Sequence, residues 1–183
     1  MKRALGLGIF AVLILTLVWA DVPKFDVFRS GKPEQVQAEL VAGTSVNAYD
    51  ANGSTPLMYA AAFNRYTEVI TMLIAAGADV KARDKLGMTA LMYAALNNTN
   101  PEVVRTLLKV GSEIDAQDTS GRTALMYSSA YNSNTAIITI LLDAGANGKL
   151  KSNTGKTSYD YAVLNRYLKN SPILTLLKGK AAN

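Results

Sequence analysis

Apolar residues recur along most of the chain in short stretches at helical spacing, separated by polar turns that contain glycine. Residues 67–75 hold an apolar face of this kind, which predicts an amphipathic helix that ends before Gly77. The apolar positions of that face are Val69, Ile70, Leu73 and Ile74. Residues 56–63 form a more uniformly apolar stretch behind Thr55, whose hydroxyl can accept a hydrogen bond from an unpaired backbone N–H at a helix start. The pattern therefore predicts two short helices, 56–63 and 67–75, followed by a glycine cap.

This two-helix pattern repeats along the chain with a period of 34 residues. The capping threonine recurs as Thr55, Thr89, Thr123 and Thr157. The glycine recurs as Gly43, Gly77, Gly111, Gly145 and Gly179. A regular period of this length indicates a solenoid of stacked units, because one unit cannot bury its apolar face alone.

Two blocks of the repeat resemble the ankyrin repeat. The first reads TPLMYAA from Thr55 and TALMYAA from Thr89, and the second reads LIAAGADV from Leu73. Both recur in register over roughly residues 25–179. The resemblance implies an all-α ankyrin-repeat solenoid of stacked helix-turn-helix units, with short β-hairpin-like fingers between them. We expect one domain over residues 21–183, with atypical first and last units. The expected units are about 25–49, 50–83, 84–117, 118–151 and 152–183.

Two columns depart from the family pattern. Methionine replaces the usual histidine at Met58, Met92 and Met126, and we interpret these side chains as packing inside the stack. Asparagine replaces the usual glycine of the turn between the two helices, at Asn64, Asn98 and Asn132. Asparagine tolerates left-handed backbone better than other non-glycine residues, so we expect these positions to be left-handed turns.

The first twenty residues have the order of a signal peptide. Lys2 and Arg3 are followed by an uncharged apolar run, Ala4 to Val18, and the small residue Ala20 precedes Asp21. We therefore expect cleavage after Ala20 and a periplasmic or secreted protein. The apolar run is shorter than the roughly 20 residues that span a bilayer. The alternative is an uncleaved N-terminal anchor in the inner membrane, and membrane contact is expected only through this segment.

Composition argues against catalysis and against nucleic-acid binding. The chain has no cysteine and no histidine, which removes the usual thiolate, imidazole and metal-ligand chemistry. We therefore expect no enzyme activity, no metal site, no cofactor and no small-molecule substrate. Asp50, Asp84 and Asp118 recur with the repeat where turn residues belong, whereas a catalytic pair should occur once. The net charge of +5 falls to +3 without Lys2 and Arg3, too small an excess to indicate a nucleic-acid partner.

The resemblance implies a protein partner, bound on the concave surface of the first helices and finger tips. Large apolar side chains that break the repeat at positions expected to face solvent are not explained by folding, and arginines could flank them. Aromatic residues, methionine and arginine are the types enriched at interface centres. The predicted partner-binding residues are Phe63, Arg83, Leu86, Met88, Leu96, Arg122 and Tyr131.

The predicted function is thus an exported protein–protein interaction module whose partner is another protein. Two roles stay open within it: a stabiliser of an exported enzyme, or an immunity protein that neutralises a toxin acting in the periplasm. An adaptor attached to the envelope or to a membrane surface is a further alternative, suggested by basic residues near the end of the chain, among them Lys149, Arg166 and Lys178.

Overall fold

The computed structural model of the chain describes residues 25–182, which form ten helices and no β-strand. The predicted signal peptide, its cleavage site after Ala20 and the alternative membrane anchor lie outside the described residues.

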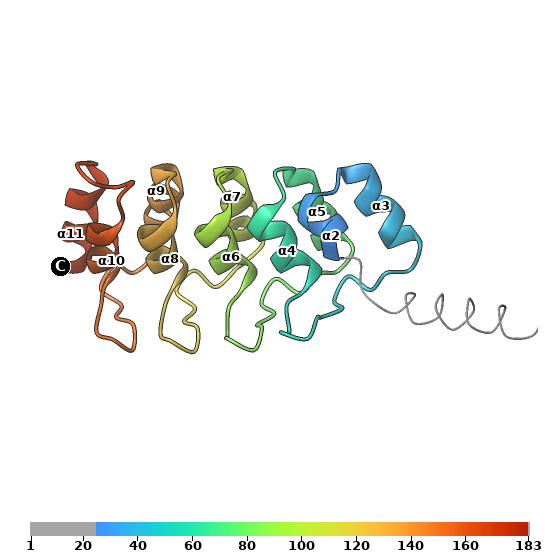
Figure 1. Ribbon diagram of the computed structural model, residues 1–183, viewed down its shortest axis with the longest axis horizontal. Helices are drawn as coiled ribbons and strands as arrows, with labels where there is room; N and C mark the ends of the chain where they lie inside the picture. Colours follow the sequence, from blue (N-terminus) through green and yellow to red (C-terminus); the bar gives the residue numbers. More distant parts are fainter. Residues whose placement is uncertain (1–24, 183) are drawn as a thin grey trace, which may run out of the picture.

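The helices form two layers that run side by side along one axis (Figure 1). The first layer contains α2 (Phe25–Ser30), α4 (Pro56–Phe63), α6 (Ala90–Asn97), α8 (Ala124–Tyr131) and α10 (Ser158–Leu164). The second layer contains α3 (Pro33–Val41), α5 (Thr67–Ala75), α7 (Pro101–Lys109), α9 (Thr135–Asp143) and α11 (Ile173–Ala182). Each helix packs on its partner in the other layer and on the next helix of its own layer. The predicted all-α repeat solenoid is therefore confirmed.

The local signals in the repeat explain where the helices begin and end. The Thr89 hydroxyl accepts a hydrogen bond from the backbone N–H of Met92, and the same cap starts α4, α8 and α10. Helices α4 and α5 begin and end at the residues that the pattern predicts. Gly77 follows α5 and has a φ of +90°, the left-handed conformation that favours glycine at a helix end. No atom lies within 4 Å of the position that a Cβ would take, so the backbone conformation, and not lack of space, favours glycine here. Gly179 is different, since it lies inside α11.

The core lies between the two layers and runs the length of the stack. Leu91 and Leu107, from the two layers of one unit, are fully buried. Ala60 and Ala94 are also buried, which lets neighbouring first helices approach closely. The methionine column lies inside the stack as predicted, with Met58, Met92 and Met126 each at most 2% exposed.

The asparagine column connects successive units by side-chain hydrogen bonds. Asn98 Nδ2 donates to the backbone carbonyls of Ala61 at 2.9 Å and Asn64 at 3.0 Å, while its Oδ1 accepts the N–H of Asn100. Asn132 repeats these contacts one unit later, donating to the carbonyls of Ala95 and Asn98. Carbonyls at the end of a helix have no intrahelical partner, so this asparagine ladder satisfies them from the next unit.

The expected left-handed turn at these asparagines is wrong. Asn64 has φ −77° and ψ 130°, and Asn98 and Asn132 are equally extended. An extended backbone directs the side chain toward the preceding unit. In the last unit the ladder residue is Asn165, one position earlier than the period predicts, and it donates to the carbonyls of Ser129 and Asn132.

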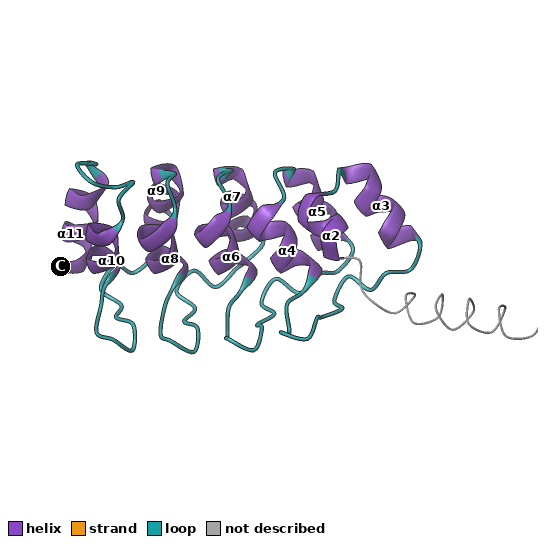
Figure 2. Ribbon diagram, viewed as in Figure 1, coloured by secondary structure: helices purple, strands orange, loops and turns teal. Residues whose placement is uncertain are grey.

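The segments between units form fingers that project from one edge of the stack, and Figure 2 shows them as loops. The finger that begins at Asp84 closes with a hydrogen bond from its N–H to the carbonyl of Met88. Its Lys85 N–H donates to the carbonyl of Asn52 in the preceding finger at 2.9 Å. The fingers are therefore hairpin-like, as predicted, although none of their residues forms a β-strand, and a hydrogen bond also links neighbouring fingers.

Candidate functional site

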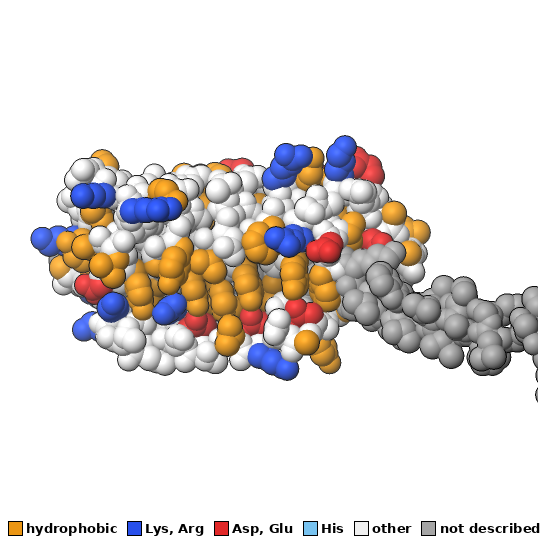
Figure 3. Space-filling model, in the orientation of Figure 1, with side chains coloured by type: hydrophobic (Ala, Val, Ile, Leu, Met, Phe, Trp, Pro, Cys, Tyr) orange, Lys and Arg blue, Asp and Glu red, His pale blue; other side chains and the backbone are white. Residues whose placement is uncertain are grey.

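The first helices and the fingers form one continuous surface, which we call the inner face. Figure 3 shows a row of hydrophobic side chains along this face, with acidic side chains directly beneath the row. This is the surface that the family resemblance assigns to partner binding. It combines an apolar band with a regular set of carboxylates.

These carboxylates belong to the aspartates that start the fingers, and each accepts hydrogen bonds from groups of its own unit. Asp84 Oδ1 accepts the backbone N–H groups of Leu86 at 2.9 Å and Met88 at 2.8 Å. Asp84 Oδ2 accepts the Tyr93 hydroxyl at 2.7 Å. The equivalent pairs are Asp50 with Tyr59 at 2.9 Å and Asp118 with Tyr127 at 2.5 Å. The aspartates thus hold each finger against its first helix, which supports the predicted turn role.

The same pairs shift the pKa of their tyrosines and, in the first pair, that of Asp50. Burial, and then the hydrogen bond to the Asp84 carboxylate, raise the pKa of Tyr93 to about 12. Burial acts to raise the pKa of Asp50 as well, but hydrogen bonds from the Ser54 backbone and the Tyr59 hydroxyl outweigh it and lower that pKa. For Asp50 and Tyr59, an ionised carboxylate and a neutral phenol are therefore the stable pair at neutral pH.

Three of the predicted partner-binding residues present large apolar side chains to solvent. Phe63 is 48% exposed, Leu86 is 61% exposed and Tyr131 is 54% exposed. Phe63 and Tyr131 end α4 and α8, while Leu86 is in the finger that precedes α6. The interior of the stack does not account for these side chains, so they are available to a partner.

Two predicted site residues belong instead to the interior. Met88 was expected to face solvent, but it is only 5% exposed and packs in the core. Its N–H and its carbonyl both bind Asp84 at the closing end of the finger, which turns its side chain inward. Leu96 is also partly buried and packs against the core, whereas the adjacent Asn97 is exposed.

Arg83 contacts the next unit rather than standing free beside the apolar residues. Its guanidinium donates to the carbonyl of Gln117 at 2.9 Å and to that of Gly87 at 3.3 Å. It also pairs with Glu113 at 3.2 Å, and its side chain is 40% exposed. These contacts connect the bases of two fingers. Arg83 therefore has a structural role that the sequence did not suggest.

Arg122 lies between aromatic rings of two units. Its guanidinium carbon is 5.8 Å from the ring centroid of Tyr127 and 5.6 Å from that of Tyr161. Cation–π contacts of this kind stabilise a half-buried arginine. Arg122 remains on the inner face, but its charge already has partners within the stack.

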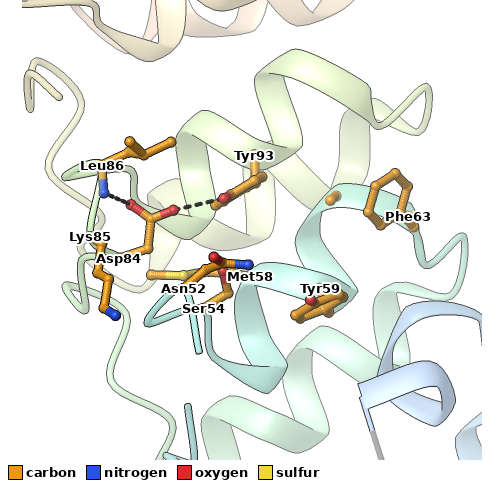
Figure 4. Close-up of a pocket in the computed structure, with 10 residues that line it drawn as sticks. Asn52, Ser54, Met58, Tyr59, Phe63, Asp84, Lys85, Leu86 and Tyr93 are labelled. Atoms are coloured by element: carbon orange, nitrogen blue, oxygen red, sulfur yellow. Dashed lines mark hydrogen bonds between the residues drawn. The ribbon is translucent and has the colours of Figure 1, made fainter. Parts of the chain in front are cut away.

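A pocket of about 470 Å³ lies on the inner face between the units of α4 and α6. Phe63 stands at one side of it and Leu86 at the other, with Tyr59, Tyr93 and Asp84 between them (Figure 4). The remaining lining residues are Asn52, Ser54, Met58, Ala62 and Lys85. The structure thus brings together Phe63 and Leu86 of the predicted set, while Tyr131 lies outside this pocket.

Sequence reasoning missed the tyrosine rings and the methionine that line the pocket. Met58 was interpreted as a packing residue, and Tyr59 and Tyr93 lie inside the strongest repeat block, which favours the same interpretation for them. A residue in a repeated column can nevertheless be partly exposed where the flanking side chains leave space, as Tyr59 and Tyr93 are. Only the stacked geometry reveals that space.

The repeat itself shows why the pocket is apolar at this junction. Phe63 and Leu86 face one another across two units, and their counterparts one unit later are Asn97 and Ser120. At the following junction the pair is Tyr131 with Thr154. Among these three junctions, only the first carries two large apolar side chains at these positions.

Comparison with known families agrees with this architecture. The sequence model of the family described as "Ankyrin repeats (3 copies)" matches residues 26–118 and again residues 96–183. The chain belongs to the ankyrin-repeat family. Ankyrin-repeat proteins are typically non-enzymatic interaction modules, so the family gives this chain a protein partner in general terms. None of the curated proteins compared with this ankyrin-repeat chain matches it in sequence.

The ionisable groups of the ankyrin stack do not gather into a metal-binding cluster in the part that the structure describes. No group of three or more acidic side chains there is arranged to hold a metal ion. Over residues 25–182 of this ankyrin-repeat chain, none of the helices has the length and apolar character needed to span a bilayer.

Proposed function

We propose that this ankyrin-repeat protein is an exported binding module that receives one bulky apolar side chain of a protein partner in the pocket between Phe63 and Leu86. The observation that supports the proposal is the pocket itself, which lies at the junction that, of the three compared, has large apolar side chains at both facing positions. Exposed aromatic and aliphatic anchors around a hollow are typical of the energetic centre of an interface.

The surroundings of the pocket favour a partner that inserts a side chain into it over a partner that only lies flat across the inner face. The walls and floor are formed mainly by carbon atoms of Phe63, Leu86, Met58 and the tyrosine rings. Arg29 lies 4.7 Å from the centroid of the Phe63 ring, which restrains that ring in its exposed position. The hydrogen bonds of Asp84 fix Leu86 on the finger. Rigid walls lower the entropy cost of binding.

Export is the second part of the proposal. It is supported by the charge and apolar order of residues 1–20, with Ala20 before Asp21. Fractionation of cells that express the full-length chain, followed by mass determination, tests it directly. A periplasmic or secreted protein that begins at Asp21 supports cleavage and export. A membrane-bound protein that retains Met1 indicates the uncleaved anchor, and a cytoplasmic protein would contradict export altogether.

The repeat offers a matched test of the pocket. Cross-linking in the compartment where the protein is found identifies the partner. The affinity of the purified protein and of its variants for that partner is then measured. The double variant F63N/L86S gives this junction the residues that the next junction already has. We expect it to bind the partner about thirtyfold more weakly or worse, the usual effect of removing an interface centre.

A transplant and a control complete the design. Adding N97F/S120L to the double variant rebuilds the apolar pair one unit later and should recover part of the affinity. V41A/V110A truncates two exposed apolar side chains away from the inner face, Val41 at the end of α3 and Val110 directly after α7. This control variant should leave the affinity for the partner unchanged. Unchanged affinity in F63N/L86S, with an intact fold, would falsify the pocket as the partner site.

Measuring the partner's own activity separates the roles left open. A stabiliser of an enzyme raises the lifetime of that enzyme's activity, whereas an immunity protein abolishes the activity of a toxin. Both outcomes are compatible with the same pocket, because the fold determines binding and the partner determines its consequence.

A further inference from the structure

The end of the solenoid that contains α10 and α11, residues 149–182, has a charge unlike that of the rest of the stack. Residues 149–182 contain seven basic residues and a single acidic one, Asp160. In residues 25–148 acidic residues outnumber basic ones, twelve to nine. The basic residues of this end are Lys149, Lys151, Lys156, Arg166, Lys169, Lys178 and Lys180. Positive charge is therefore concentrated at one end of the solenoid.

None of these basic side chains forms an ion pair among the described residues, although Lys151 and Lys156 are near enough to Asp160 to help lower its pKa. Asp160 Oδ2 already accepts hydrogen bonds from the backbone N–H of Thr157 at 2.8 Å and from its hydroxyl at 2.7 Å. The ion pairs found among the described residues join Arg83 with Glu113 and Arg105 with Glu102, and none involves a basic residue of the last unit. Within the described residues, seven cations at this end thus face one carboxylate, and none of them is held in an ion pair.

Large apolar side chains protrude at the same end. Val163 and Leu164, the last two residues of α10, are 54% and 71% exposed. Tyr167, in the loop that follows α10, is 53% exposed. The Arg166 guanidinium lies 4.8 Å from the Tyr167 ring centroid and donates to its hydroxyl at 2.7 Å, which holds the two side chains together. Figure 3 shows basic and hydrophobic side chains intermingled at the end where Figure 1 places α10 and α11.

We propose that this end of the solenoid binds an anionic phospholipid surface. Basic residues attract such a surface, while tyrosine and leucine side chains insert at the level of the lipid headgroups. Leu164 and Tyr167 project outward, which suits a fluid surface that deforms around them better than a rigid partner. The site is separate from the pocket on the inner face, and it does not depend on the proposed function.

Vesicle sedimentation with the full-length chain tests this. The vesicles contain phosphatidylcholine alone, or phosphatidylcholine with one quarter phosphatidylglycerol. We expect binding to the anionic vesicles to exceed binding to the neutral ones, and the excess to shrink as salt is raised. The first 24 residues are common to all variants, so binding is compared between variants and between the two vesicle types.

Two variants with equal charge change locate the effect. R166Q/K169Q/K178Q/K180Q removes four basic residues of the last unit, and K32Q/K81Q/K85Q/K109Q removes four exposed lysines elsewhere. Each basic residue near an anionic surface contributes about fivefold, so the first variant should lose more than about tenfold in the anionic-vesicle partition coefficient. The second should lose less than about threefold, as expected for residues held away from the surface. L164S/Y167S should remove the binding that persists at high salt.

Three results would overturn the proposal. Equal losses in the two charge variants would mean that net charge alone attracts the vesicles. Equal binding to the two vesicle types would exclude recognition of anionic lipid. Tighter binding to soluble polyglutamate than to anionic vesicles, unaffected by L164S/Y167S, would assign this end to an acidic protein partner instead.

Discussion

The side-chain amide of Asn132 donates a hydrogen bond to the backbone carbonyl of Asn98, 2.9 Å away and one unit earlier in the stack. Asn98 does the same to Asn64 at 3.0 Å. Each of these residues therefore donates with its side chain and accepts with its backbone, so the ladder passes through the stack at buried positions. Buried donors and acceptors without partners are costly, and the stability of the stack should depend on these amides.

Replacing Asn98 by alanine should lower the free energy of unfolding by about 2–4 kcal/mol, because the carbonyls of Ala61 and Asn64 and the N–H of Asn100 all lose their partner. Urea denaturation measures this change. N97A, at the exposed neighbouring position, is the control and should stay within about 0.5 kcal/mol of the natural protein. Equal stability of the two variants would show that the ladder is dispensable.

Tyr93 should make the stability of the fold sensitive to alkaline pH. Its pKa is raised by burial and by Asp84 to about 12 in the folded chain, against about 10 for an unperturbed tyrosine. As pH rises from about 10 to about 12, the unfolded chain loses this proton first, so the free energy of unfolding falls across that window. Below about pH 10 the stabilisation that comes from the raised pKa of Tyr93 is fully present.

Chemical denaturation at a series of alkaline pH values measures this slope. Y93F lacks the titrating group, so its stability should fall less steeply in that window. It should also be less stable at neutral pH by about 1–2 kcal/mol, since the hydrogen bond to Asp84 is lost. Y49F, at a position 75% exposed, is the matched control. The same slope in Y93F as in the natural chain would contradict the assignment.

Leu107 and Leu91 should be strong determinants of stability, since both are fully enclosed between the layers. Truncating either one to alanine should cost about 2–5 kcal/mol, the usual effect of emptying a core position. Thermal or denaturant unfolding measures the loss. Losses near zero at both positions would be incompatible with the stacking register described above.

Leu86 and Met88, two residues apart on one finger, should behave in opposite ways. M88A should cost about 2–4 kcal/mol because the Met88 side chain fills part of the core. L86A should alter stability by less than about 0.5 kcal/mol, because the Leu86 side chain is mostly in solvent. Partner affinity should show the reverse order once both variants are confirmed to be folded. A stable M88A variant with reduced affinity would restore Met88 to the binding site.

The local features of the fold could be predicted from the sequence because they depend on near neighbours along the chain. Thr55, the apolar stretch behind it and Gly77 define helix starts and stops through contacts within a few residues. The asparagine column was also recognised as structural. Its mechanism was not, because the acceptors of Asn98 lie in the preceding unit and 34 or more residues away.

The candidate site was predictable only in part for the same reason. Phe63 and Leu86 could be identified because they break the repeat at positions that face solvent. Met88 could not be told apart from Leu86, since the direction of each side chain depends on how Asp84 closes the finger. The roles of Arg83 and Arg122 depend on groups of the following unit, Gln117 and Tyr161, which no local pattern reveals.

The asparagine ladder has a consequence for how such a chain can grow. A duplicated segment of 34 residues, such as 84–117, would bring one amide donor for the unit before it and one carbonyl acceptor for the unit after it. An inserted copy would therefore meet both neighbours with the contacts they already make. Gene duplication could lengthen the stack in steps of one unit without any compensating substitution at the new junctions.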